Sequence, residues 1–196
     1  MSNKANSWTR ILAMAKTEWR NVPNVLTIAR GPMGIAVFAL LIMGYPVVAS
    51  WMYVITALTD MVDGWWARHF HQETLLGKSL DPIMDKLLVA AVGIGLCITR
   101  PEPWVLIPIG IILVREAGVI ILVERFRKKN LMLSVTWAGK TKTMAQGIAF
   151  YLLIRNPAGD WVQPVRYIIV IAVTLTVVSG VDYIVRARTL LRPIPE

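Results

Sequence analysis

The sequence has 196 residues, of which 56% are hydrophobic and 17% are charged, and its formal net charge is +9. Its mean hydropathy of +0.56, with the apolar residues gathered in long stretches of few charges, excludes an ordinary soluble domain. The basic residues cluster at the edges of these stretches, which indicates contact with anionic lipid head groups and not with nucleic acid. We therefore expect an all-α integral membrane protein.

Residues 1–22 contain the first predicted element. Trp8, Ile11, Ala15 and Trp19 recur at helical spacing, and four basic residues lie among them. This pattern favours an amphipathic helix that lies in the membrane interface, with its tryptophans at head-group depth. A frayed tail is the alternative.

Six transmembrane helices are predicted to follow, each about 20 residues long, the length that crosses a bilayer. Because the connections between them are short, residues 23–190 are predicted to form a single membrane domain, followed by a tail at residues 191–196. The predicted spans cover approximately residues 25–45, 47–68, 81–98, 104–126, 135–154 and 161–186.

Six spans place both termini on the same side of the membrane. Most of the 21 basic residues fall in segments on that side, whereas only Arg100, Arg155 and Arg166 fall on the opposite side. Basic residues concentrate in cytoplasmic loops, so we expect both termini to face the cytoplasm.

Four aspartates lie where the second predicted span ends and the third begins. Asp60 and Asp63 are three residues apart and share a helix face, and Asp81 and Asp85 are four residues apart on the next helix. The short connection makes these helices antiparallel neighbours, so the four carboxylates should meet near the cytoplasmic interface. The alternative for Asp81 is an ordinary N-cap, with Pro82 at the first helical position.

Carboxylates this close together cannot all stay ionised unless positive charge lies between them. Oxygen ligands on rigid helices suit Mg²⁺, Mn²⁺ or Ca²⁺, and a pair of such ions serves phosphoryl transfer. Gly64 and Ala67 leave space for a bulky anionic substrate, and Arg68 could bind one of its phosphate oxygens. The alternative for Asp85 is a solvated interfacial pair with Lys86.

The stretch from Asp60 to Asp85 reads D-x2-D-G-x2-A-R-x8-G-x3-D-x3-D. It resembles the signature of the CDP-alcohol phosphotransferase family, whose members transfer a phosphatidyl group from CDP-diacylglycerol to an alcohol and release CMP. The resemblance implies a bacterial inner-membrane enzyme, six transmembrane helices, a homodimer and a polar cavity that faces the cytoplasm.

The same resemblance assigns roles to individual residues. Asp60, Asp63, Asp81 and Asp85 would hold two ions of Mg²⁺ or Mn²⁺, and Asp85 would also be the general base on the acceptor hydroxyl. CDP-diacylglycerol would be bound by the remaining motif positions together with Asp60, namely Gly64, Ala67, Arg68 and Gly77.

Three polar residues of the first predicted span, Asn24, Thr27 and Arg30, are expected to face the same cavity and bind the nucleotide. The alternative is that they form only a helix N-terminus and an interface anchor.

Three basic residues further along the chain are candidates for binding the acceptor. Arg115 lies within the fourth predicted span, where a cation is costly, and Lys140 and Lys142 enter the fifth. We expect them to bind the phosphate of an acceptor such as glycerol 3-phosphate, beside the metals. The alternative pairs Arg115 with Glu116 and lets both lysines reach the interface.

Three further stretches, "NVPNVLTIARGP", "LVREAGVI" and "VTWAGKTKTMAQ", resemble the family members that use glycerol 3-phosphate. Members that use phosphatidylglycerol or inositol phosphate are alternatives. A divalent-cation transporter is a further alternative, but it would need carboxylates near the bilayer midplane, and here they cluster at one edge.

Overall fold

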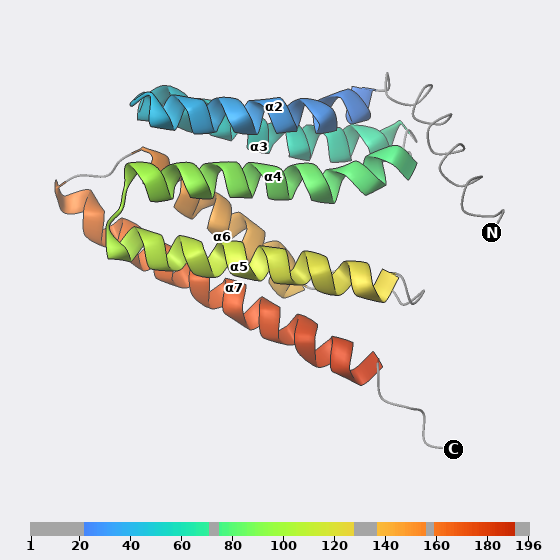
Figure 1. Ribbon diagram of the computed structural model, residues 1–196. Coiled ribbons are helices and arrows are strands. Elements are labelled where there is room, and N and C mark those ends of the chain that lie inside the picture. Colours follow the sequence, from blue (N-terminus) through green and yellow to red (C-terminus); the bar gives the residue numbers. More distant parts are fainter. Residues whose placement is uncertain (1–21, 71–74, 128–136, 156–158, 191–196) are drawn as a thin grey trace, which may run out of the picture. The chain divides into compact units, whose positions relative to one another are not determined.

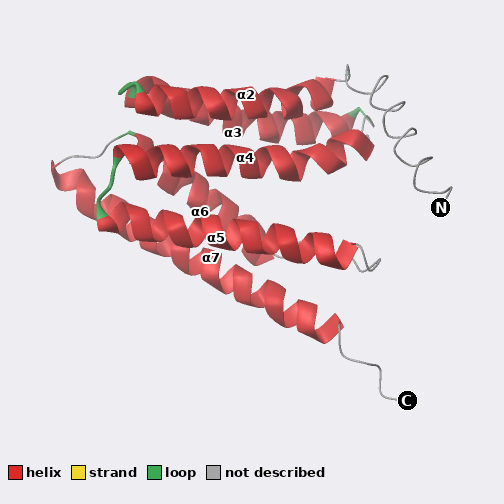
Figure 2. Cartoon of the chain, in the orientation of Figure 1, coloured by secondary structure: helices red, strands yellow, loops and turns green. Residues whose placement is uncertain are grey.

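The computed structural model describes residues 22–70, 75–127, 137–155 and 159–190. In these ranges the secondary structure is helical, with no strand (Figure 2). The predicted N-terminal amphipathic helix and C-terminal tail lie outside the described residues. The elements, labelled in Figure 1, are α2 (Val22–Ile42), α3 (Pro46–His69), α4 (Leu75–Thr99), α5 (Pro103–Arg127), α6 (Trp137–Ile154), a short 3-10 helix (Gly159–Trp161) and α7 (Val162–Leu190).

The chain divides into two compact units, Met1–Val92 and Gly93–Glu196. The first unit contains α2, α3 and most of α4. The second contains the last turns of α4 together with α5, α6 and α7.

Four of the described helices are long and apolar enough to cross a membrane. They correspond to the first, third, fourth and sixth predicted spans, and the qualifying segments are Asn24–Ile42, Leu80–Thr99, Pro103–Val123 and Val162–Thr189. The second and fifth predicted spans are present as α3 and α6. These two helices are less apolar because α3 carries Asp60 and Asp63, and α6 carries Lys140 and Lys142.

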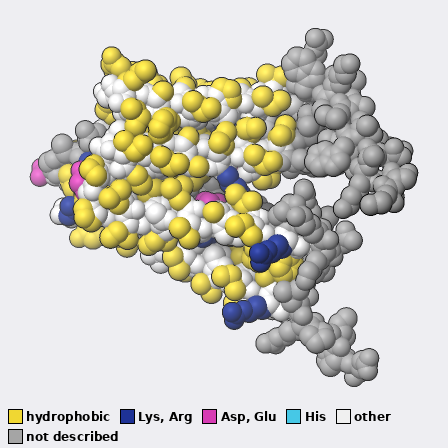
Figure 3. Space-filling view, viewed as in Figure 1, with side chains coloured by type: hydrophobic (Ala, Val, Ile, Leu, Met, Phe, Trp, Pro, Cys, Tyr) yellow, Lys and Arg dark blue, Asp and Glu magenta, His cyan; other side chains and the backbone are white. Residues whose placement is uncertain are grey.

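Apolar side chains cover much of the visible surface of the described helices (Figure 3). On α5, for example, Ile107, Val114 and Ile121 recur every seven residues, and each is more than half exposed. Soluble proteins rarely expose contiguous apolar surface of this extent, whereas a helix that faces lipid carries it at no cost. The outer surface therefore agrees with the prediction of a membrane protein.

The turn between α2 and α3 follows from three adjacent residues. Gly44 has a φ of +79°, a conformation that glycine adopts without steric cost. Its amide and that of Tyr45 donate to the carbonyls of Leu41 and Leu40, at 3.1 Å and 2.9 Å, which is a Schellman motif. Pro46 is the first residue of α3. Its lack of an N–H costs no hydrogen bond there, because the first N–H groups of a helix have no partner within the helix.

Helix α4 begins at Leu75, earlier than the predicted start at Asp81. Asp81 and Pro82 therefore lie inside the helix, and the alternative in which Asp81 is the N-cap is wrong. Pro82 removes one hydrogen bond from the helix, as Pro108 does in α5. Membrane helices tolerate such interior prolines.

Glycines of α2 allow α4 to pack closely in the first unit. A Cβ atom added at Gly34 would lie 3.3 Å from the Cα atom of Leu88, and one at Gly31 would lie 3.1 Å from the Sδ atom of Met84. This close approach places the polar residues near the start of α2 within reach of the aspartates on α4.

The core of the second unit is built from α5, α6 and α7, and α7 packs on both of the others. The buried apolar side chains of this core are Val105, Ile109, Ile112, Ala149, Phe150, Leu153, Val165, Ile169 and Ala172.

Candidate active site

Three of the four motif aspartates meet polar side chains of α2. The Arg30 guanidinium donates from Nη1 to Oδ1 of Asp85 at 2.6 Å, and its Nη2 lies 2.9 Å from Oδ1 of Asp60. The Thr27 hydroxyl donates to Oδ1 of Asp81 at 2.6 Å. Helix α2 therefore links the carboxylates of α3 and α4 at one place.

Asn24, Thr27 and Arg30 recur every three residues on α2, and all three are buried. Thr27 and Arg30 contact the aspartates from this face. Their expected role in nucleotide binding stays a prediction.

Arg30 is fully buried, whereas the side chains of Asp60 and Asp85 are 50% and 49% exposed. A buried cation needs partners, and here the two carboxylates supply them. Since half of each carboxylate side chain remains open, both can also reach a ligand. The arrangement is suited to holding a charged substrate or ion next to a fixed guanidinium.

The other motif residues occupy helical positions, but their side chains lie outside the described part of the structure. Among the side chains that are described, no group of three or more His, Cys, Asp or Glu is placed to hold a metal ion. The expected quartet includes Asp63, so its completeness stays a prediction. The motif residues whose surroundings are not described are Asp63, Gly64, Ala67, Arg68 and Gly77.

A second polar cluster lies within the second unit. Arg115 donates from Nη1 to Oε1 of Glu116 at 3.0 Å and from Nη2 to the Ser179 hydroxyl at 2.9 Å. The Lys142 ammonium also donates to Oε1 of Glu116. Glu116, Lys142 and Ser179 are buried. One carboxylate thus partners two cations, and the three charged groups sum to one positive charge.

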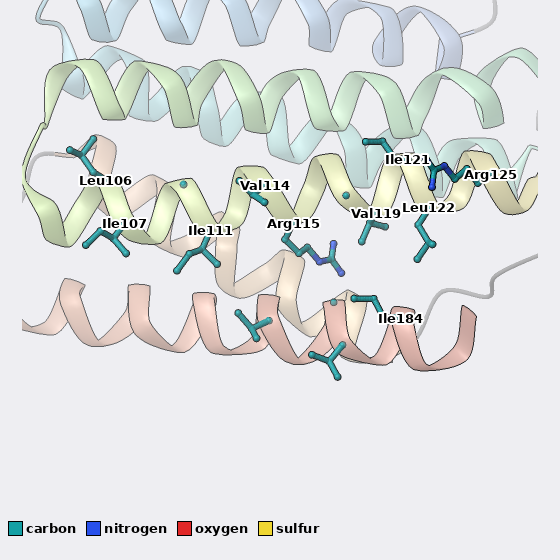
Figure 4. A pocket seen from close by; sticks show the side chains of 15 residues that line it. Leu106, Ile107, Ile111, Val114, Arg115, Val119, Ile121, Leu122, Arg125 and Ile184 are labelled. Carbon is teal, nitrogen blue, oxygen red and sulfur yellow. The ribbon is translucent and has the colours of Figure 1, made fainter. Parts of the chain in front are cut away.

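Helix α7 fixes the position of the Arg115 side chain, which reaches from α5 toward α7 (Figure 4). Its Cζ atom lies 5.7 Å from the centre of the Tyr183 ring, a cation–π distance. A Cβ added at Gly180 would lie 3.3 Å from its Cγ atom, so any larger residue there would make the Arg115 side chain shift by a few tenths of an ångström. Ser179 completes the contact, since it donates its own proton to the Thr176 carbonyl and accepts from Arg115.

The Arg115 side chain also forms part of the wall of an apolar cavity of about 830 Å³ between α5 and α7 (Figure 4). The structure thus pairs Arg115 with Glu116, as the alternative interpretation expected, but Lys142 is buried against the same carboxylate and does not reach out of the helices as that interpretation expected. The binding of an acceptor by Arg115 and Lys142 stays a prediction. The side chain of Lys140 is not described. No local pattern in the sequence predicts the α7 residues that contact Arg115.

Comparison with known proteins identifies the family. Residues 20–180 match the CDP-alcohol phosphatidyltransferase family, so the chain belongs to that family. It is therefore a phosphotransferase, and dependence on divalent metal is general in the family.

The chain is similar to curated enzymes from several enteric bacteria. Three are the CDP-diacylglycerol–glycerol-3-phosphate 3-phosphatidyltransferases of Shigella flexneri serotype 5b (strain 8401), Salmonella typhimurium (strain LT2) and Escherichia coli (strain K12). Each is 33% identical over 174 residues, which covers 86% of this chain and 95% of the relative.

Proposed function

We propose that the protein transfers the phosphatidyl group of CDP-diacylglycerol to glycerol 3-phosphate, giving phosphatidylglycerophosphate and CMP. The observation that carries this proposal is the convergence of Asp60, Asp81 and Asp85 on the buried polar face of α2. The acceptor is taken from the activity named for the relatives.

We propose that Asp60, Asp63, Asp81 and Asp85 hold two ions of Mg²⁺ or Mn²⁺. The donor set fits, because these ions prefer carboxylate oxygens and both Asp60 and Asp85 are half exposed. Bound there, the ions would neutralise the diphosphate of the substrate and polarise the phosphorus that is attacked.

Asp85 is proposed as the general base. It accepts the proton of the acceptor hydroxyl as that oxygen bonds to the phosphorus attached to diacylglycerol, and the bond from this phosphorus to CMP breaks. Arg30 donates to the Asp85 carboxylate at 2.6 Å and thereby orients it. Thr27 does the same for Asp81.

The nucleotide part of CDP-diacylglycerol is assigned to the small and polar residues around these aspartates. Gly64 and Ala67 leave room for it, Arg68 and Arg30 supply positive charge for its phosphates, and Asn24 supplies an amide at the buried face of α2. Gly77 completes this set by its place in the motif.

The acceptor phosphate is assigned to Arg115, Lys142 and Lys140. Glu116 partners both described cations, and the three groups carry a net positive charge that favours a dianionic ligand. The fork of the Arg115 guanidinium suits phosphate oxygens. This contact would make the protein select glycerol 3-phosphate over an uncharged alcohol as the acceptor.

The proposal also includes a bacterial inner-membrane homodimer in which α2 to α7 are six transmembrane helices. Both termini and the aspartates then face the cytoplasm, where CDP-linked and phosphorylated substrates are available. Four strongly apolar helices and the clustering of basic residues support this arrangement.

The test is CMP release by the purified protein with CDP-diacylglycerol and Mg²⁺ or Mn²⁺, offering glycerol 3-phosphate, inositol phosphate or phosphatidylglycerol in separate reactions. We expect release with glycerol 3-phosphate. Preference for either other acceptor would reassign the substrate, and no metal-dependent release with any of them would refute the enzyme mechanism.

The role of Asp85 is tested by Asp85→Asn, which should still bind CDP-diacylglycerol but lose turnover. The matched control is Asp182→Asn on α7, which removes only a surface pair with Arg186. Equal turnover in Asp85→Asn and the parent would exclude Asp85 as the base.

A further inference from the structure

Two arginines of the second unit lie against one tryptophan, apart from the cluster around Arg115. The Cζ atoms of Arg100 and Arg166 lie 5.5 Å and 5.0 Å from the centre of the Trp104 ring. Each contact is a favourable cation–π interaction. Together these contacts hold two positively charged guanidinium groups close to one ring. The two groups repel each other, and an anion bound between them would relieve that repulsion.

The neighbouring acid, Glu102, does not neutralise both cations. Oε1 of Glu102 lies 3.9 Å from Nη2 of Arg100, too far for a hydrogen bond, and Oε2 of Glu102 is buried without a partner. Arg100 also donates from Nη1 to the Leu153 carbonyl at 3.3 Å. One positive charge is left over in this group of three charged side chains.

Arg166 is the arginine of this group whose hydrogen-bond donors lack partners. Its Nε atom is buried without a hydrogen-bond partner, and no described residue forms a hydrogen bond or ion pair with its guanidinium. A buried donor without an acceptor is costly, so a guanidinium held in this way is expected to find an oxygen ligand.

The group lies where a head group can reach it. Arg100 follows the end of α4, Trp104 is in the first turn of α5, and Arg166 is in the second turn of α7. These ends bound helices that are long enough to cross a membrane, and tryptophan is enriched at head-group depth. Arginines are disfavoured on the side opposite the other basic residues, so these two need a local reason to be there.

We propose that Arg100 and Arg166, held on Trp104, form a binding site for a phosphate group at this end of the helices. The ligand is either the phosphate of a phospholipid head group or free inorganic phosphate. The two guanidinium groups can each present a planar fork to phosphate oxygens. This site is independent of the proposed phosphatidyl transfer, because none of its residues belongs to the candidate active site.

The experiment uses the full chain in detergent and follows tryptophan fluorescence. The contribution of Trp104 is the difference between the fluorescence of the parent and that of Trp104→Phe. The parent is titrated with dihexanoyl phosphatidylglycerol in one arm and with inorganic phosphate in the other. A saturable change in Trp104 fluorescence in the lipid arm but not in the phosphate arm identifies a head-group site. A change with inorganic phosphate, with or without the lipid, identifies a site for free phosphate. No saturable change in either arm overturns the proposal.

Variants separate this site from general attraction of anions. Arg166→Gln should weaken the titration by about tenfold, the cost expected for a lost charge-assisted hydrogen bond. Arg155→Gln is the matched control, because Arg155 is an exposed arginine just beyond the end of α6 and should leave the titration unchanged. Equal weakening by both variants would contradict the proposal.

If Arg166→Gln fails to fold, Arg166→Lys takes its place. It keeps the charge but loses the fork, so it should bind the ligand more weakly than the parent. Parent-like binding by Arg166→Lys would refute recognition by the guanidinium.

Discussion

Replacing Gly34 by leucine should separate α2 from α4 and disable the candidate active site. A Cβ at Gly34 already lies 3.3 Å from the Cα atom of Leu88, so the rest of a leucine side chain has no space. Interaxial distances of packed helices range from about 8 to 10 Å with the size of the side chains at the contact. The substitution should therefore move the helices apart by roughly 1–2 Å.

That displacement is larger than the hydrogen bonds between α2 and α4 can tolerate. The Thr27–Asp81 and Arg30–Asp85 contacts are both 2.6 Å, and a displacement of about 1 Å would lengthen them to about 3.6 Å, a distance at which no hydrogen bond forms. A misplacement of about 1 Å at reacting groups can lower turnover by roughly 100-fold. We also expect a loss of about 1–3 kcal/mol in stability from overpacking.

The assay is CMP release at saturating CDP-diacylglycerol and glycerol 3-phosphate, with thermal unfolding measured on the same samples. Gly110→Leu is the control, because a Cβ at Gly110 meets nothing within 4 Å. It should change turnover by no more than about twofold, because the added side chain enters open space. A folded Gly34→Leu protein with turnover close to that of Gly110→Leu would refute the reasoning.

Three further predictions concern the acceptor and the metal. Ser179→Ala removes a hydrogen bond to Arg115 and should raise the KM for glycerol 3-phosphate about tenfold, while the KM for CDP-diacylglycerol is unchanged. Tyr183→Leu should raise the same KM about threefold and Tyr183→Phe should not, because phenylalanine keeps the ring under the guanidinium. A rise in both KM values would indicate general damage. Chelation with EDTA should stop CMP release, and excess Mg²⁺ or Mn²⁺ should restore it; activity that persists in EDTA would refute the metal assignment.

The helices could be predicted from the sequence because long apolar stretches and their turn residues are local signals. The sequence predicts too late a start for α4, because a proline such as Pro82 usually marks the beginning of a helix in soluble proteins. In the structure the helix runs through that proline. Tolerance of an interior proline is a property of the packed helix and not of the local sequence.

The candidate site was predictable to the extent that its residues are close in the sequence. The motif spacing placed Asp81 and Asp85 on one helix, and both contact α2. Arg30 contacts both Asp60 and Asp85 through one guanidinium. This shared contact depends on the packing of three helices, which no local pattern predicts. The contacts of Ser179 and Tyr183 with Arg115 likewise join residues far apart in the chain, where no local pattern applies.

The carboxylate shared between Arg115 and Lys142 bears on how the protein enters its membrane. Lys142 is buried on α6, and its counter-ion Glu116 belongs to α5, which the ribosome makes first. A lone ammonium in a nascent span would resist partitioning into lipid. In the proposed arrangement of six transmembrane helices, insertion of α6 would therefore depend on α5 already lying beside it, so the two helices should enter the lipid as a pair.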